Sequence, residues 1–361
     1  MFFLNKSFTT VDIGSAAIKA ARIKESKDGI EVQNVAHTTL PENTIDKGEI
    51  QDSSILSSEL DYLFNQMNHQ PKRIVTSVPN QNLVIRNVNL PGVMLDELDD
   101  ALKWEAEDYL PFPAEEAVMD YIVLEEKEDA IDIILVATQS RILHSYKEIF
   151  KRLGLEISVV NTQPLALMSL LESKNSDFNT SGIIEIGASS TRIIIGDTKG
   201  VYLFRTLDIG GSSFTSIIQE SRSLNYQEAE NYKKQNGIQN ALDEAAASKE
   251  ENDEELDFLQ LSGGGTEGQM LVSEADDLAY EISRSLEFFD RNHPDKEIEQ
   301  FYVCGGGSLL KGLMSFLEQE TELQFNLIDP FKGTQAPRVG QIDSIQFSVA
   351  VGLGYSEVLA N

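Results

Sequence analysis

One short pattern occurs twice in this chain, and it limits the possible folds more than any other feature. Residues 11–23 (VDIGSAAIKAARI) and 184–196 (IEIGASSTRIIIG) superpose without a gap across a turn. In each copy an apolar strand carries an acid, Asp12 or Glu185, and then turns at a glycine, Gly14 or Gly187. Such a turn lets main-chain N–H groups approach phosphate oxygens, while the acid can hold hydrated Mg²⁺. One copy alone would be an ordinary hairpin. Two copies indicate a duplicated domain that binds a polyphosphate from both sides.

The segments around the two copies also follow the same order. Alternating apolar residues predict strands at 18–23 and 30–37 after the first turn, and at 202–208 after the second. A later strand at 301–304 leads into three glycines and a serine at 305–308, and then into a predicted helix from 309 to about 320. Glycines there allow close approach of a flat ligand or a phosphate, although a simple strand-to-helix turn has the same sequence. The order of two phosphate loops and an adenosine loop resembles the ATPase superfamily of actin, Hsp70 and sugar kinases. It implies a duplicated, ribonuclease H-like α/β fold with two domains.

Longer segments narrow the resemblance to the PilM family of type IV pilus assembly proteins. The most specific is LPGVMLDELDDALKWEAEDYLPFPAEEAVMDYIVL at 90–124, and KGEIQD, RTLDIGGSSFT, AENYKK, CGGGSLLKG and VAVGLGY add to it. The resemblance covers nearly the whole chain except an acidic stretch at 239–269, which we expect to be an exposed loop. It implies an actin-like first domain at 1–81, completed by 156–180 and 336–361. An inserted subdomain of the FtsA/PilM type would span 82–155, and a second actin-like domain 181–335.

The resemblance also implies nucleotide-binding roles for individual residues. Asp12 matches the position that holds a Mg²⁺-bound water, and Lys19 matches the position that reaches the β- and γ-phosphates of ATP. Glu230 and Lys233 match positions near the ribose, although a solvated ion pair on a helix would look the same. The other matching positions are Gly14, Ser15, Gly187, Thr191, Gly211, Gly305, Gly306, Gly307 and Ser308. The expected ligands are therefore ATP and Mg²⁺, held in an interdomain cleft.

Two departures from the superfamily pattern predict at most slow ATP hydrolysis. The matching catalytic positions are Asp12, Gln163 and Glu185. Glu185 replaces the usual aspartate, and its extra methylene displaces the carboxylate by about one C–C bond length, which disturbs an in-line water. Gln163 replaces a water-activating glutamate, and an amide can orient a water but cannot accept its proton. We expect nucleotide binding rather than rapid turnover.

The predicted insert carries the candidate site for a protein partner. A helix expected at about 96–109 places Leu98 and Tyr109 on an apolar stripe, which by default packs on the insert's own sheet. Trp104, the only tryptophan, lies off that stripe and close in sequence to Tyr109 and Phe112. It is either a core residue or part of a groove. The resemblance implies a groove, in which Leu98, Trp104, Tyr109 and Phe112 would bind the cytoplasmic tail of a PilN-like inner-membrane protein.

Charge and composition exclude other partners and compartments. The chain has 59 acidic and 29 basic residues, and this net charge of −30 would repel a nucleic-acid backbone. A single cysteine, Cys304, suits a reducing compartment. The sequence shows neither a signal peptide nor an apolar run of spanning length. We expect a cytoplasmic protein that reaches the inner membrane only through its partners, with pilus motor ATPases as further partners.

Other members of the superfamily fit less well. A small-molecule kinase would need a polar substrate pocket and a catalytic aspartate, and an Hsp70-like chaperone would need a substrate-binding domain after residue 361. The nearest alternatives are an FtsA-like cell-division protein and the cytoplasmic L component of type II secretion. We expect neither, because the sequence shows no C-terminal amphipathic membrane helix and no transmembrane helix. A non-enzymatic, ATP-binding scaffold is therefore the favoured interpretation.

Overall fold

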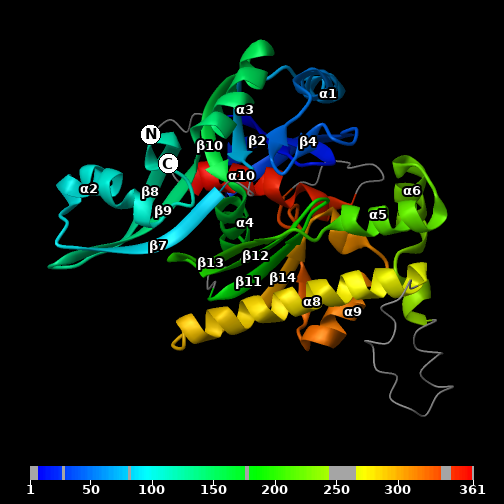
Figure 1. Cartoon of the computed structure of the whole chain (residues 1–361). Coiled ribbons are helices and arrows are strands. Elements are labelled where there is room, and N and C mark those ends of the chain that lie inside the picture. The colour runs from blue at the N-terminus through cyan, green and yellow to red at the C-terminus, as the bar shows by residue number, and fades with distance from the viewer. Residues whose placement is uncertain are drawn as a thin grey trace. The chain divides into compact units, whose positions relative to one another are not determined.

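A computed structural model of the chain describes residues 7–26, 29–79, 83–174, 179–243, 266–334 and 343–359 (Figure 1). The chain divides into two compact units. The first comprises Met1–Gly182, Ile194–Phe204 and Ile328–Asn361, and the second comprises Ile183–Ile193 and Arg205–Leu327. Among the described residues, every helix is too short or too polar to cross a lipid bilayer.

The first unit is built on a five-stranded sheet with the order β10-β6-β1-β2-β3. Its strands are β1 (Ser7–Ile13), β2 (Ala17–Ser26), β3 (Gly29–Thr39), β6 (Arg73–Val78) and β10 (Glu156–Thr162). The first three form an antiparallel meander, whereas β6 runs parallel to β1 and β10 runs parallel to β6. The carboxyl ends of β1, β6 and β10 therefore meet at one edge of the sheet, where polar side chains from distant parts of the sequence can gather.

Outside the insert, the described α-helices of this unit are α1 (Ser53–Gln66), α3 (Ser140–Arg152), α4 (Gln163–Glu172) and α10 (Ser348–Leu359). The Asp52 carboxylate caps α1 by accepting from the N–H groups of Ser54 and Ile55, and buried leucines on one stripe turn that helix toward the sheet. A two-stranded ribbon of β4 (Ile45–Asp46) and β5 (Glu49–Ile50) precedes α1. Helix α10 lies against α4, where a Cβ atom at Gly352 would come within 2.4 Å of the Ala166 carbonyl oxygen.

The insert has its own sheet and its own apolar core. Its strands β7 (Leu83–Pro91), β8 (Ala117–Glu126) and β9 (Ala130–Gln139) pair in the order β7-β9-β8. Helix α2 (Leu98–Glu105) lies between the 3₁₀ turns Leu95–Glu97 and Ala106–Asp108, and a third 3₁₀ turn spans Ala114–Glu116. The buried face of α2 packs with side chains of β7 and β9. Helix α3 contributes Tyr146 and Phe150 to the core of the first sheet instead, so the insert's own core ends with β9.

The second five-stranded sheet repeats the order of the first. Its order is β13-β12-β11-β14-β15, with β11 (Ser181–Ile186), β12 (Thr191–Asp197), β13 (Gly200–Leu207), β14 (Gln300–Cys304) and β15 (Phe325–Leu327). In both sheets three consecutive strands form a meander. Two strands from later in the chain extend the sheet on the free side of the meander's first strand. The duplication predicted from residues 11–23 and 184–196 is therefore present at the level of topology.

The longer helices of the second unit are α5 (Gly211–Arg222), α6 (Tyr226–Asn236), α8 (Glu267–Asn292) and α9 (Leu313–Thr321). The predicted helix at 309–320 was placed too early: residues Gly306–Leu309 form a 3₁₀ turn, and α9 begins only after Gly312, whose φ is +87°. The predicted acidic loop at 239–269 was wrong at both ends. Residues 239–243 are helical, and α8 starts at Glu267 behind a capping box of Thr266 and Gln269. Residues 244–265 of that loop lie outside the described residues.

Candidate functional site

The first hairpin, between β1 and β2, places a cation directly opposite an acid. Asp12 pairs in register with Lys19 across the two strands, and Lys19 Nζ lies 3.4 Å from Asp12 Oδ2. The turn closes through a hydrogen bond from the Gly14 N–H to the Ala17 carbonyl, 3.0 Å long, and the half-buried Ser15 lies inside this turn. A Cβ atom at Gly14 would lie 3.4 Å from Lys19 Nζ. The absence of that atom leaves room for a ligand beside the ammonium group.

Gln163 joins this group from the far end of the sheet. It follows the last residue of β10, Thr162, whose hydroxyl caps α4, and its amide Nε2 donates to Asp12 Oδ1 at 3.1 Å. The parallel arrangement of β1, β6 and β10 explains this contact, since it brings their carboxyl ends together. Three predicted residues, Asp12, Lys19 and Gln163, are therefore assembled within one unit, and Asp12 is held by a donor on each oxygen.

The second hairpin, between β11 and β12, repeats this arrangement with different residue types. Glu185 takes the place of Asp12, and Arg192 Nη1 lies 2.8 Å from Glu185 Oε1. The Gly187 N–H donates to the Ser190 carbonyl at 2.9 Å, and a Cβ atom at Gly187 would lie 3.3 Å from Arg192 Nη1. The predicted ligand contact of Thr191 finds no support here. Its side chain is fully buried, and its hydroxyl donates to the Ile209 carbonyl at 2.8 Å.

A buried lysine ties this hairpin to the next two helices. The Gly211 N–H at the start of α5 donates to the Gly187 carbonyl at 3.0 Å. The Lys233 ammonium donates to the Gly211 carbonyl at 2.7 Å and to the Thr215 hydroxyl at 2.8 Å, and it pairs with Glu230 Oε2 at 2.6 Å. These three partners use all three of its N–H donors. As placed here, Lys233 has no donor left for a ribose, and its role is to fix the start of α5.

Glu230 is the remaining polar group of this cluster, and it keeps unused acceptor capacity. Burial alone would raise the pKa of its carboxyl, but the charge of Lys233 and hydrogen bonds from Lys233 and Thr215 lower that pKa overall. Thr215 therefore belongs to the same network; it is the last residue of the RTLDIGGSSFT motif, which gave it no role of its own. Glu230 stays ionised at neutral pH, so it can accept a hydrogen bond from a ligand hydroxyl.

The glycines after β14 lie directly on the strand that leads into the second hairpin. Gly305 has φ +89° and ψ +158°, and a Cβ atom there would lie 2.3 Å from the Ile186 carbonyl oxygen. At Gly307 a Cβ atom would lie 2.4 Å from the Ile186 side chain. Gly306 between them is exposed, and the Ser308 hydroxyl donates back to the Gly305 carbonyl at 2.7 Å. The loop is therefore shaped by its packing on β11, and only Gly306 presents an open backbone.

These features fit a phosphate-bearing ligand with one hydrated cation. In each hairpin the turn residue beside the cation is a glycine, so no Cβ atom fills the space next to the cation. In addition, Glu185 Oε2 is a buried oxygen without a hydrogen-bond partner among the described residues. Within the described part of the chain, no cluster of three or more His, Cys, Asp or Glu side chains gathers to hold a metal directly. A Mg²⁺ ion that keeps several waters and is bound through one carboxylate and phosphate oxygens matches this donor set.

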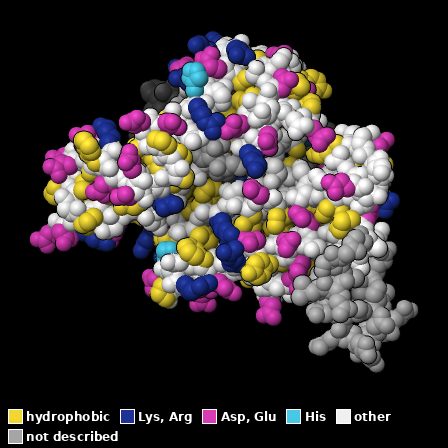
Figure 2. Space-filling view, in the orientation of Figure 1, with side chains coloured by type: hydrophobic (Ala, Val, Ile, Leu, Met, Phe, Trp, Pro, Cys, Tyr) yellow, Lys and Arg dark blue, Asp and Glu magenta, His cyan; other side chains and the backbone are white. Residues whose placement is uncertain are grey.

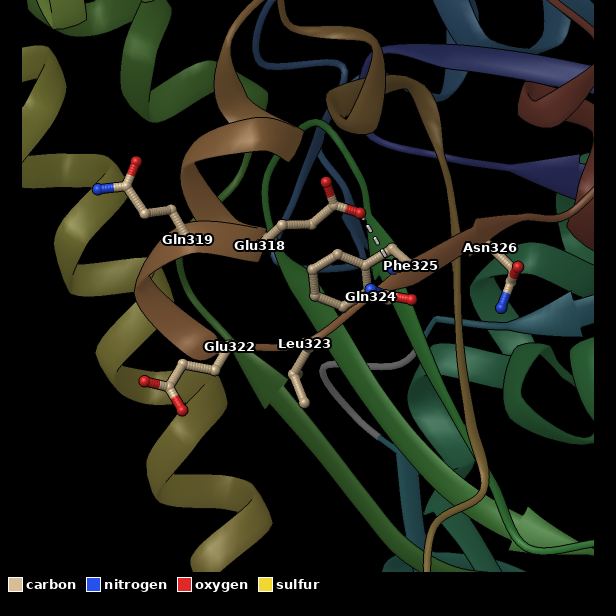
Figure 3. Close-up of a pocket in the computed structure, with 7 residues that line it drawn as sticks. All are labelled: Glu318, Gln319, Glu322, Leu323, Gln324, Phe325 and Asn326. Atoms are coloured by element: carbon tan, nitrogen blue, oxygen red, sulfur yellow. Dashed lines mark hydrogen bonds between the residues drawn. The ribbon is translucent and has the colours of Figure 1, made fainter.

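A separate depression lies at the end of α9. Figure 3 shows Glu318, Glu322, Phe325 and their neighbours around it, and the Glu318 carboxylate accepts the Phe325 N–H at 3.1 Å. It is lined by residues from the end of α9 to β15, acidic and amide side chains together with Leu323 and Phe325, and it contains neither of the hairpins. We do not place the nucleotide there, because it offers no cation for a phosphate.

The structure separates the four predicted partner residues. Trp104 is 86% exposed, which excludes the core-packing alternative. Leu98 is fully buried in the insert's core, so its prediction as a partner contact was wrong: it lies on the opposite face of α2. Tyr109 and Phe112 are half-buried against the same core. In Figure 2 the end of the insert that carries α2 shows hydrophobic and acidic side chains next to one another. Met94, Leu95 and Trp104 are exposed on and just before α2, and Val118, Ile122 and Val123 are exposed on β8 of the same insert.

Two sheets of equal strand order, each with a hairpin that joins an acid, a glycine and a cation, define an actin-like ATPase fold. The family model described as type IV pilus assembly protein PilM matches residues 10–246 and 248–357. The chain therefore belongs to the PilM family. This assignment favours a pilus protein over the alternatives from cell division and type II secretion.

Individual relatives agree with this class. The cell division protein FtsA of Bacillus subtilis is 22% identical over 381 residues, which cover 97% of this chain and 83% of FtsA. A solved PilM-PilN type IV pilus biogenesis complex matches with a TM-score of 0.80 at 22% identity, over 98% of this chain and 99% of the other. MreB5 of Spiroplasma citri, bound to ADP, matches with a TM-score of 0.52 at 13% identity, over 98% and 97%. At these identities the two structural matches show the fold.

Proposed function

We propose that this chain is an ATP- and Mg²⁺-binding scaffold of type IV pilus assembly. It would bind the cytoplasmic tail of a PilN-like inner-membrane protein and couple that protein to cytoplasmic pilus motors. The observation that carries the nucleotide part is the repeated hairpin, in which a cation lies over a glycine beside an acid. The MreB5 structure bound to ADP and the PilM-PilN complex support the two parts of the proposal as properties of related folds.

Each group has a defined task in this proposal. Lys19 offers an ammonium group to phosphate oxygens, and the open edge at Gly14 lets main-chain N–H groups contribute. Asp12 would hold a water of hydrated Mg²⁺, which supplies charge neutralisation between phosphates when it is bound. Gln163 fixes Asp12 through its amide and cannot accept a proton, so it orients the carboxylate without acting as a base. Glu230 would accept a ribose hydroxyl, and Gly306 would lie against the adenine.

Binding of ATP in the presence of Mg²⁺ is the direct test. We expect the wild-type protein to bind ATP in isothermal titration calorimetry and Lys19→Ala to lose about 1.5–3 kcal/mol of binding free energy, as for one hydrogen bond to a charged group. Lys24→Ala is the matched control, because Lys24 lies on the same strand and pairs with Glu31 near the surface. Absence of any heat of binding to the wild type at millimolar ATP would contradict the proposal.

The partner part rests on the exposed face of α2. Trp104 projects into solvent, and acidic residues flank it one helical turn away on either side, at Asp100 and Asp108. An exposed tryptophan among carboxylates suits a tail that combines apolar side chains with Lys or Arg, the usual composition of cytoplasmic flanks of membrane spans. Opposite charges would raise the association rate, and apolar anchors would set the dissociation rate.

Replacement of Trp104 by alanine tests this surface. We expect the variant to lose more than about 1 kcal/mol of binding to the partner tail, as for an interface hot spot, with ATP affinity unchanged. Because the side chain is exposed, its removal opens no cavity, and the melting temperature should stay the same. Tyr62→Ala removes an exposed aromatic residue of α1 and should leave capture of the tail unchanged. Equal capture by Trp104→Ala and wild type would move the partner site elsewhere.

A further inference from the structure

The second hairpin carries a cation that the proposed function does not use. Arg192 occupies the place that Lys19 occupies in the first hairpin: it follows the turn on the second strand, pairs with the acid of the first strand and lies over the turn glycine. The distances from an added Cβ atom at the glycine to the cation are nearly equal, 3.3 Å for Arg192 and 3.4 Å for Lys19. The two hairpins therefore repeat the cation as well as the backbone.

The donors of Arg192 are only partly used. Nη1 contacts Glu185 Oε1 at 2.8 Å, and Nη2 donates to the Ser190 hydroxyl at 3.3 Å. A guanidinium group has five N–H donors. Among the described residues, Nε has no hydrogen-bond partner, and neither has the second oxygen of Glu185, although both atoms are buried. A two-pronged arginine–carboxylate pair would satisfy both atoms. The observed single contact leaves the pair incomplete.

We propose that Arg192 is a second phosphate-binding side chain, supplied by the second hairpin as Lys19 is by the first. Its remaining N–H donors would contact phosphate oxygens of the bound nucleotide while one nitrogen keeps its contact with Glu185. Arginine suits this task because its planar, delocalised group presents several donors to one phosphate. The inference rests on the proposed binding of ATP and names a residue to which that proposal gives no role.

The test separates phosphate recognition from nucleoside recognition. Equilibrium binding of ATP, ADP and adenosine is measured with Mg²⁺ on the full chain, for the wild type and for Arg192→Met and Arg192→Lys. We expect Arg192→Met to reduce ATP affinity by about 10- to 100-fold and to leave adenosine affinity within about twofold, because one charge-assisted contact is lost. Arg192→Lys keeps the positive charge but not the planar set of N–H donors, so its ATP affinity should lie between those of Arg192→Met and the wild type.

Arg205→Met is the matched control. Arg205 is also a partly buried arginine of the second unit, paired with Glu281 and hydrogen-bonded to Ser285, and it lies outside both hairpins. It should leave the ratio of ATP to adenosine affinity unchanged. A wild-type ratio in Arg192→Met would overturn the inference while wild-type binding of ATP stands. Failure of the wild type to bind ATP would instead overturn the proposed function.

A second variant covers loss of folding. Removal of Arg192 alone leaves the buried Glu185 carboxylate without its cation, which can unfold the hairpin. The double variant Arg192→Met/Glu185→Gln removes both charges and is compared with Glu185→Gln alone. We expect a further reduction of ATP affinity by about tenfold or more in the double variant, which should melt no lower than Glu185→Gln because it leaves no buried charge unpaired. Equal ATP affinities in these two variants would contradict a phosphate contact of Arg192.

Discussion

Replacement of Lys233 by methionine should lower the free energy of unfolding by about 3–5 kcal/mol. The side chain is buried, and its ammonium group joins α6 to the start of α5 through the Gly211 carbonyl and the Thr215 hydroxyl, while it also pairs with Glu230 of its own helix. Methionine keeps the apolar stem but removes the buried cation beside the Glu230 carboxylate and one of the donors to the Gly211 carbonyl. Chemical denaturation of the two proteins gives the difference directly. ATP affinity should also fall, because α5 starts beside the second hairpin.

Lys234→Met is the control for this experiment. Lys234 contacts the same Glu230 at 3.3 Å but is largely exposed, so its removal should cost at most about 1 kcal/mol. Both variants remove one positive charge beside Glu230, and they differ in whether the replaced lysine was buried or exposed. Because the pKa of Glu230 is lowered in the folded protein, its pairing stabilises the fold above the unfolded-state pKa and is lost as pH falls. The stability difference between wild type and Lys233→Met should therefore shrink on acidification. Equal stabilities of the Lys233 and Lys234 variants would refute the buried network.

Replacement of Gly305 by alanine should cost about 3–5 kcal/mol of stability and abolish high-affinity ATP binding. Its backbone conformation, with φ +89° and ψ +158°, is almost restricted to glycine and costs about 1–3 kcal/mol for other residues. The new methyl group would also lie 2.3 Å from the Ile186 carbonyl oxygen, so β11 or the loop must move. Displacement of β11 would disturb Glu185 on the same strand. Thermal unfolding and calorimetric titration measure the two effects.

Gly154→Ala is the control that separates the cost of a positive φ from the cost of a steric clash of the new methyl group. Gly154 has φ +71°, and a Cβ atom there would meet nothing within 4 Å. This variant should therefore cost only about 1–2 kcal/mol, and ATP affinity should not change. If both glycine variants lose the same stability, the close approach between Gly305 and β11 makes no separate contribution.

The hairpins were predictable from the sequence because each is a local pattern. The acid, the glycine and the cation lie within eight residues of one another, and antiparallel pairing then fixes which side chains are opposite. The family resemblance picked out Asp12 and Gln163 separately, and their contact comes from the parallel strands that bring them together.

The roles of Lys233, Leu98 and α3 could not be predicted in the same way. A lysine three residues from a glutamate on a helix looks like a solvated pair, and only the approach of α5 shows that it is buried. The apolar stripe of α3 gives its direction but does not say which of two cores it enters. Trp104 had equal grounds for burial and exposure, and the decision came from the rotation of α2 on its sheet.

The position of α10 against α4 has a consequence for synthesis of the protein on the ribosome. Helix α10 covers α4 and also contacts β1, β2 and β3, yet it is translated long after them. At about 5–20 residues per second, the delay between α4 and α10 is on the order of ten to forty seconds. All segments of the second unit emerge within that interval. The nascent first sheet therefore lacks its cover from α10 until that helix is made, and apolar surface exposed for so long is of the kind that chaperones protect from aggregation.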